Sequence, residues 1–232
     1  KVEYCDLIGI VGNTDSGKTT LLNAILNNLD ILEDFESNIS QIIVNGSVSY
    51  VPQTPWIIND TIKENILFNK EYDEERYKQI IRICELEKDL LSLKRGDFSR
   101  VGDKGGEILS NGQKIRISIA RAVYSDSDIY LFDDPLSAIE PSTSKTFFHQ
   151  LIKEYLNTKT ILIVTHELQY IRYMKHVIHM NKGRIDFFGT ADQAMEQSFY
   201  RKFLGTQLRK KMSEDFSDIK NINNNNNNNN NN

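Results

Sequence analysis

Residues 12–19 constrain the fold of this chain more than any other part of its sequence. Their letters, GNTDSGKT, fit the pattern G-x-x-x-x-G-K-[ST] of a phosphate-binding loop. The apolar run at residues 7–11 predicts a buried strand before the loop, and residues 20–26 predict a helix after it. This strand–loop–helix context separates the motif from a chance glycine-rich turn ending in Lys-Thr. The chain is therefore expected to bind phosphate here.

The residue types in the loop indicate how it would hold phosphate. Glycines let the backbone curl so that several N–H groups converge on an anion, and the positive end of the following helix adds to the attraction. We expect Lys18 to contact the β- and γ-phosphates and the Thr19 hydroxyl to ligate Mg²⁺. The predicted phosphate-binding residues are Gly12, Asn13, Thr14, Asp15, Ser16, Gly17, Lys18, Thr19 and Thr20.

Composition restricts the class of protein. Of 232 residues, 39% are hydrophobic and 26% are charged, which is ordinary for a globular protein, and the net charge is −4 with no long basic run. These values argue against a nucleic-acid groove as the main function. The longest apolar runs are far shorter than a membrane span. Cys5 and Cys84 lack metal-like spacing and are expected to be inert core thiols, which suits the cytosol.

Three further predicted strands end in polar residues. A strand at residues 46–51 is followed by Pro52 and Gln53, and the Gln53 side chain could reach Mg²⁺ or an attacking water. The alternative is a solvated loop residue, as most such glutamines are. A strand at residues 129–132 ends at Asp133 and Asp134. A carboxylate at the end of a core strand beside a phosphate loop suits Mg²⁺, and a second one could orient or deprotonate water, although acidic pairs are often only turn formers. A strand at residues 161–164 is followed closely by His166, which could touch the γ-phosphate.

The middle of the chain carries helix signals and no strand pattern. Thr61 and Glu64 fit a capping box, and from Asp73 onward the apolar residues recur at helical spacing at Tyr77, Ile80, Ile81, Cys84 and Leu91. We interpret residues 54–120, approximately, as a small helical lobe.

A second candidate anion site begins at Ser110, a good helix N-cap, in the segment LSNGQ. The helix behind it has a buried face at Ile115, Ile119 and Ala122. A serine hydroxyl, the Gly112 N–H and a helix N-terminus would meet there. The alternative is a capped helix with no ligand.

The two ends of the chain lead to separate expectations. The phosphate loop begins so early that we expect an N-terminally truncated domain, lacking the sheet that usually covers an adenine. Near the other end, Asn181, Lys182 and Gly183 signal a hairpin, and Thr190 with Gln193 a capping box. Residues 207–232 turn polar and end in an asparagine run, so a disordered tail is expected there.

The ordered set of phosphate loop, Gln53, Leu-Ser-Asn-Gly-Gln signature, Asp133 and His166 resembles the nucleotide-binding domain of an ATP-binding cassette (ABC) transporter. Residues 46–53, the Glu-Asn-Ile-Leu-Phe run at 64–68, and the segments at 120–125 and 133–138 resemble the multidrug-resistance-associated proteins of subfamily C. Most cassettes carry glutamate at the position of Asp134. In having aspartate there, this sequence is similar to the first of that subfamily's two cassettes.

The resemblance implies an α/β fold: a P-loop NTPase (RecA-like) core with a mostly parallel sheet and a helical signature lobe, within a domain spanning residues 1–206. It implies ATP and Mg²⁺ as cofactors, with Thr19, Gln53 and Asp133 at the metal. Asp134, His166 and Gln53 would take catalytic positions, as general base, γ-phosphate switch and metal sensor. Ser110, Gly112 and Gln113 would meet ATP held by a second cassette.

The implied partners are that second cassette and the transmembrane domains of an integral membrane transporter, at whose cytoplasmic face this domain would work, without nucleic acid. Three departures put hydrolysis in doubt more than binding: Asp134, Asn111 in place of the signature's usual first glycine, and Glu140 where aspartate is usual. The expected function is an energy-coupling ATPase cassette of an exporter. The alternatives are a regulatory ATP-binding cassette with little hydrolysis, or a non-transport ABC ATPase.

Overall fold

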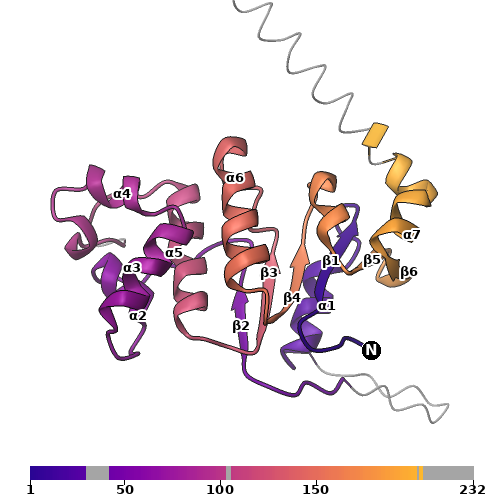
Figure 1. Ribbon diagram of the computed structural model, residues 1–232, viewed down its shortest axis with the longest axis horizontal. Helices are drawn as coiled ribbons and strands as arrows, with labels where there is room; N and C mark the ends of the chain where they lie inside the picture. Colours follow the sequence, from indigo (N-terminus) through magenta and orange to yellow (C-terminus); the bar gives the residue numbers. More distant parts are fainter. Residues whose placement is uncertain (30–41, 103–105, 203, 206–232) are drawn as a thin grey trace, which may run out of the picture.

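The computed structural model describes residues 1–29, 42–102, 106–202 and 204–205. Within these ranges the chain forms a mixed sheet with the strand order β2-β3-β4-β1-β5-β6, flanked by helices (Figure 1). The strands are β1 (Leu7–Gly12), β2 (Val48–Val51), β3 (Ile129–Asp133), β4 (Thr160–Val164), β5 (His176–Asn181) and β6 (Arg184–Thr190). All pairings are parallel except that of β5 with β6. The predicted α/β fold with a mostly parallel sheet is confirmed.

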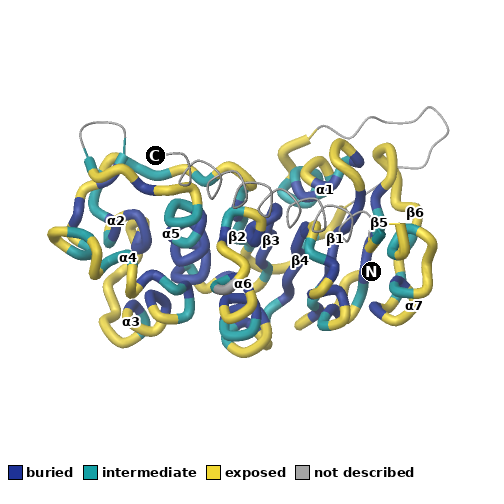
Figure 2. Tube along the Cα trace, turned by 90° about the horizontal axis from the view of Figure 1, so that it is seen from above, coloured by how far each residue is buried: buried dark blue, intermediate teal, exposed yellow. Residues whose placement is uncertain are grey.

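Central strands are buried on both faces, which explains their nearly continuous apolar sequences. In β4, Ile161 and Ile163 pack into the larger core, whereas Leu162 and Val164 pack into a smaller one on the opposite face. Figure 2 shows α1 (Lys18–Ile25) on one face and α6 (Pro141–Phe147) on the other. The π-helical segment η2 (Phe148–Tyr155) continues α6. The first helix therefore starts at the carboxyl edge of β1 and closes the smaller core.

Helices between β2 and β3 gather at one end of the sheet, at the left of Figure 1. They are α2 (Ile62–Leu67), α3 (Glu74–Ile83), α4 (Glu87–Ser92), the 3₁₀ turn η1 (Gly96–Phe98) and α5 (Asn111–Tyr124). Buried residues of α2, α3 and α5 pack together and join the larger core of the sheet. This arrangement is consistent with the predicted helical lobe.

The helical spacing of apolar residues predicted from Asp73 onward does not extend to Leu91. The helix stops at Ile83, and Glu85 adopts a left-handed backbone conformation (φ 55°) that turns the chain before α4 begins. Leu91 therefore lies on a different helix and is 86% exposed. Tyr77, Ile80, Ile81 and Cys84 are buried as expected.

The C-terminal half follows its turn and cap signals. Lys182 and Gly183, both with positive φ, join β5 to β6, and Thr190 and Gln193 form the capping box of α7 (Ala191–Glu196). The 3₁₀ segment η3 (Leu168–Tyr173) connects β4 to β5. The expectation for residues 207–232 lies outside the described residues.

The two cysteines differ in their exposure to solvent. Cys84 is buried as predicted, but Cys5 is exposed, because it lies in a turn before β1 rather than in the strand. The prediction of a core thiol at position 5 is therefore wrong. Among the described residues, no helix combines the length and apolar character needed to cross a bilayer.

Candidate functional site

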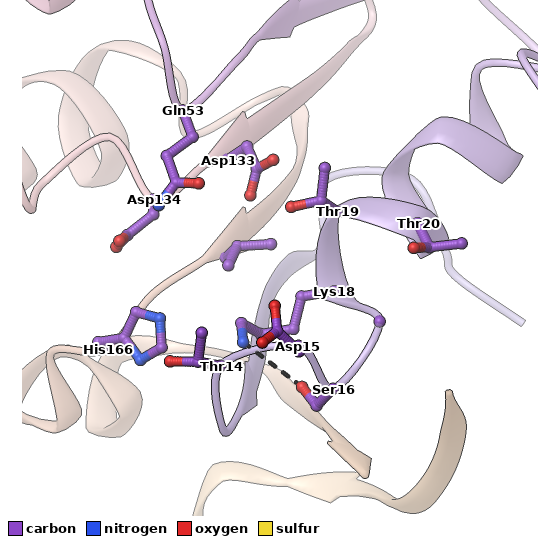
Figure 3. Close-up of a pocket in the computed structure, with 12 residues that line it drawn as sticks. Thr14, Asp15, Ser16, Lys18, Thr19, Thr20, Gln53, Asp133, Asp134 and His166 are labelled. Carbon is purple, nitrogen blue, oxygen red and sulfur yellow. Dashed lines mark hydrogen bonds between the residues drawn. The ribbon is translucent and has the colours of Figure 1, made fainter. Parts of the chain in front are cut away.

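Four parallel strands place the predicted phosphate, metal and catalytic residues at one edge of the sheet. The phosphate loop follows β1, Gln53 follows β2, Asp133 ends β3, and His166 follows β4. Because carboxyl ends of neighbouring parallel strands share one edge, these residues meet although they are far apart in the sequence. They border a cavity of about 420 Å³ (Figure 3). Its lining residues are Thr14, Asp15, Ser16, Gly17, Lys18, Thr19, Thr20, Gln53, Asp133, Asp134, Val164 and His166.

The loop's curvature depends on backbone conformations that favour glycine. Gly17, the N-cap of α1, has φ 100°. A Cβ atom on Gly12 would lie 2.3 Å from the carbonyl oxygen of Met180, so the neighbouring strand leaves no room for a side chain. The Gly183 N–H donates to the carbonyl oxygen of Ser16 at 2.9 Å, which ties the loop to the β5–β6 turn. These contacts hold the curved backbone of the loop in place.

Lys18 is buried at the start of α1. Its Nζ donates hydrogen bonds to the carbonyl oxygens of Gly12 (3.1 Å) and Asn13 (2.6 Å) and to Ser16 Oγ (3.4 Å). Burial lowers the pKa of Lys18, an effect that the nearby carboxylates of Asp134 and Asp133 oppose. Gly12 and Asn13 therefore serve the site through their carbonyl groups, as supports for the ammonium.

The donor atoms at the cavity suit a magnesium ion. Asp133, Thr19 and Gln53 line it together. Among the described residues, no three His, Cys, Asp or Glu side chains are grouped to hold a metal by themselves. Mg²⁺ in nucleotide sites takes only one or two protein carboxylates and completes its shell with phosphate oxygens and water. A carboxylate, a hydroxyl and an amide oxygen beside a phosphate loop fit this requirement.

Asp134 is buried beside Asp133 in a left-handed backbone conformation (φ 52°). The Asp134 N–H donates to the Val164 carbonyl oxygen (3.1 Å), and the Asp134 carbonyl oxygen accepts from Ser137 Oγ (2.8 Å). Burial raises the pKa of the Asp134 carboxyl group, although the electrostatic interaction with His166 opposes this shift. Figure 3 shows Asp134 and His166 at the same side of the cavity. These two hydrogen bonds fix the backbone of Asp134, from which its side chain extends.

The signature residues do not join this cavity. Ser110 caps α5 by accepting the Gln113 N–H at Oγ (3.2 Å), while the Gln113 side chain accepts the Ser110 N–H (2.9 Å). A Cβ atom on Gly112 would lie 2.8 Å from the carbonyl oxygen of Ala138, in the segment that follows Asp134. Ser110, Gly112 and Gln113 therefore lie at the start of α5, outside the cavity that the chain's own phosphate loop lines.

Sequence reasoning missed several residues that support the site. Val164 lines the cavity, and the Tyr50 hydroxyl donates to Asp133 Oδ2 at 3.4 Å. Burial and the nearby Asp133 raise the pKa of Tyr50 to about 12. The parallel pairing of β2 with β3 places Tyr50 beside Leu131, two residues before Asp133. The sequence did not indicate that these two strands are neighbours. Asp89 and Arg116, which adjoin Gln113, were also missed.

Comparisons with known proteins agree with this geometry. A family model described as ABC transporter matches residues 1–137. ABC transporter C family member 12 of Dictyostelium discoideum is 42% identical over 181 residues, which cover 78% of this chain and 13% of that protein. ATP-binding cassette sub-family C member 4 is 39% identical in Mus musculus and 38% in Homo sapiens, each over 209 residues. Those matches cover 90% of this chain and 15% of each relative. The chain thus spans a small part of the relatives' length.

Proposed function

This chain belongs to the ABC transporter family as an ATP-binding cassette of subfamily C, and from that premise we propose that it binds Mg²⁺–ATP and works in a pair with a second cassette. The pair would couple ATP binding and hydrolysis to the export of a substrate across a membrane. In this proposal residues 1–206 form one cassette whose helical lobe, α2 to α5, carries the signature. It would act at the cytoplasmic face, attached to transmembrane domains.

One observation carries the proposal. The phosphate loop, Asp133 and His166 converge on one cavity of about 420 Å³, whereas the signature at Ser110 offers a helix N-terminus elsewhere. A site with phosphate-binding donors but no phosphate loop of its own suits a nucleotide held by another cassette. Two complementary half-sites on one chain support head-to-tail pairing.

Each residue would have a defined task. Lys18 and the loop N–H groups would hold the phosphates, while Thr19, Asp133 and Gln53 would hold Mg²⁺, which neutralises phosphate charge when bound. Asp134 would orient or deprotonate the attacking water, and His166 would contact the γ-phosphate. Ser110 and Gly112 would donate to the partner's nucleotide.

The alternative is a regulatory cassette that holds ATP and hydrolyses it slowly. Asp134 favours it, because aspartate is one methylene shorter than glutamate and its backbone is held here by hydrogen bonds with Val164 and Ser137. An error of about 1 Å in the position of a catalytic group can cost on the order of a hundredfold in rate. Binding of Mg²⁺–ATP is common to both candidates.

Metal-dependent nucleotide binding tests the shared claim. A fluorescent ATP analogue is titrated with and without Mg²⁺ against the wild-type chain, Asp133→Asn and the exposed control Asp192→Asn. We expect Mg²⁺ to strengthen binding to the wild type and the control, and Asp133→Asn to abolish only that gain. The absence of ATP binding, or an unchanged Mg²⁺ effect in Asp133→Asn, would contradict the proposed site.

A further inference from the structure

Asp89, on α4, connects that helix to the first turn of α5. Its Oδ1 accepts a hydrogen bond from Gln113 Nε2 at 3.1 Å, and its Oδ2 accepts from Arg116 Nε at 3.1 Å and Nη2 at 2.6 Å. The side chains of Asp89 and Arg116 are only 18% and 13% exposed. Charge-assisted hydrogen bonds shielded from water are the strong and geometrically specific ones. One carboxylate thus fixes two residues of α5.

Gln113 is fixed in one amide orientation by these contacts. Its Nε2 donates to Asp89, and its Oε1 accepts the N–H of Ser110 at 2.9 Å. A flipped amide would set its NH₂ group against the Ser110 N–H and its oxygen against the Asp89 carboxylate, and both contacts would be repulsive. The charge on Asp89 therefore selects the orientation that caps the helix.

The orientation of Gln113 in turn determines what Ser110 can offer a ligand. Ser110 Oγ accepts the backbone N–H of Gln113 at 3.2 Å. Because this bond uses the hydroxyl oxygen as an acceptor, the hydroxyl hydrogen can be donated outward. Arg116 balances the charge of Asp89, so the carboxylate adds little repulsion toward an anion at the helix N-terminus.

We propose that Asp89 is a positioning residue for the signature, acting through Gln113 on Ser110. The proposal rests on the proposed function, in which Ser110 donates to the nucleotide of a partner cassette. In Asp89→Asn one uncharged oxygen would have to serve both Gln113 and Arg116, and the new NH₂ group would face one of them. The Gln113 amide then loses its fixed orientation, the cap loosens, and the Ser110 donor is no longer pre-organised.

A double-mutant cycle in the full-length transporter tests this pathway. The variants are Asp89→Asn, Gln113→Ala and their combination. Glu87→Gln is the matched control, because it removes the same charge from α4 at an exposed residue that contacts Arg82 rather than α5. Steady-state ATPase kcat and KM, melting temperature, and hydrogen–deuterium exchange of residues 109–114 are measured on each.

We expect Asp89→Asn to lower kcat about five- to tenfold, the equivalent of roughly one hydrogen bond, with little change in KM. Exchange of the 109–114 peptide should accelerate, and Glu87→Gln should match the wild type. The double variant should be no slower than Gln113→Ala alone, because residues acting along one path are not additive.

Two results would overturn the proposal: kcat losses that multiply in the double variant, or wild-type kcat and exchange in Asp89→Asn. Ser110→Arg separates this failure from failure of the proposed function. If Ser110→Arg abolishes turnover while Asp89→Asn has no effect, only the positioning role is wrong. If Ser110→Arg leaves turnover intact, the proposed pairing itself is wrong.

Discussion

The ammonium group of Lys18 lies 2.6 Å from the carbonyl oxygen of Asn13, in the loop that precedes its own helix. A second carbonyl, that of Gly12, accepts from the same nitrogen at 3.1 Å. The loop therefore holds the ammonium in place, and in the proposed site a phosphate would meet a fixed charge rather than a flexible side chain.

Replacement of this charge should weaken nucleotide binding. Lys18→Ala removes a charge-assisted contact worth roughly 1.5–3 kcal/mol, which corresponds to a Kd for ATP about ten- to a hundredfold higher. The exposed residue Lys70 provides the control, since Lys70→Ala removes an equal charge away from the cavity. Titration of a fluorescent ATP analogue measures both, and equal affinities for Lys18→Ala and wild type would remove Lys18 from the site.

Lengthening the carboxylate at position 134 should speed hydrolysis. Asp134→Glu moves the carboxylate by about 1.5 Å toward the length that most cassettes use, and errors of about 1 Å can cost on the order of a hundredfold. We expect a higher rate of phosphate release at saturating ATP in the full transporter, and a lower rate for Asp134→Asn. If Asp134→Glu gives no gain, the limitation lies elsewhere, for instance in the partner's signature.

Gly112 should tolerate no side chain without a shift of the signature. In Gly112→Ala the new Cβ would lie 2.8 Å from the Ala138 carbonyl oxygen, a distance that real Cβ atoms essentially never show. We expect lower ATPase activity in the transporter and unchanged ATP affinity at the chain's own loop. Gly205→Ala, where an added Cβ would lie in open space among the described residues, is the matched control. Wild-type turnover in Gly112→Ala would show that the close approach of the Ala138 carbonyl oxygen to position 112 is unimportant for ATPase activity.

The buried carboxylate of Asp6 predicts a pH-dependent stability. Burial alone would raise its pKa, but hydrogen bonds from Lys175 Nζ (2.5 Å) and the Glu3 N–H (3.0 Å) outweigh burial and lower it. A lowered carboxyl pKa stabilises the folded chain above the unfolded value, about pH 3.9, and this stability is lost as pH falls through the folded pKa.

Asp6→Asn should therefore lower the free energy of unfolding at pH 7 by about 1–2 kcal/mol, toward the lower end because Lys175 is half-exposed. The difference in the free energy of unfolding between Asp6→Asn and the wild type should shrink as the pH falls below about 4. Urea unfolding across this range measures it, with Asp192→Asn as the exposed control. A deficit that is independent of pH would mean that Asp6 contributes through packing rather than charge.

Local signals in the sequence were enough for much of the fold and the cavity. The phosphate-loop pattern, the apolar strands and the capping boxes at Ser110 and Thr190 each depend on neighbouring residues, and the strands and these two boxes are confirmed. Thr61 caps α2 as predicted, but its N–H donates to Asp60 rather than to Glu64, so the predicted capping box is only half formed. The shared cavity of Gln53, Asp133 and His166 followed from one general property of parallel sheets.

The features that were missed or wrong depend on contacts distant in sequence or on single backbone angles. The Tyr50–Asp133 bond needs the order of the strands, and the Asp89–Gln113 bond needs the docking of α4 on α5. Leu91 was misplaced because a left-handed Glu85, a conformation that the residue type does not favour, divides what reads as one helix.

The Ser110→Arg variant tests most directly the claim that the chain contributes to two different nucleotide sites. ATP affinity is measured on the chain itself, and ATPase activity on the full transporter, with melting temperatures for both. The account predicts unchanged affinity, a loss of about 1 kcal/mol in stability from the altered cap, and strongly reduced turnover, because the arginine blocks closure on the partner's nucleotide. Full ATPase activity in a properly folded Ser110→Arg transporter would contradict it.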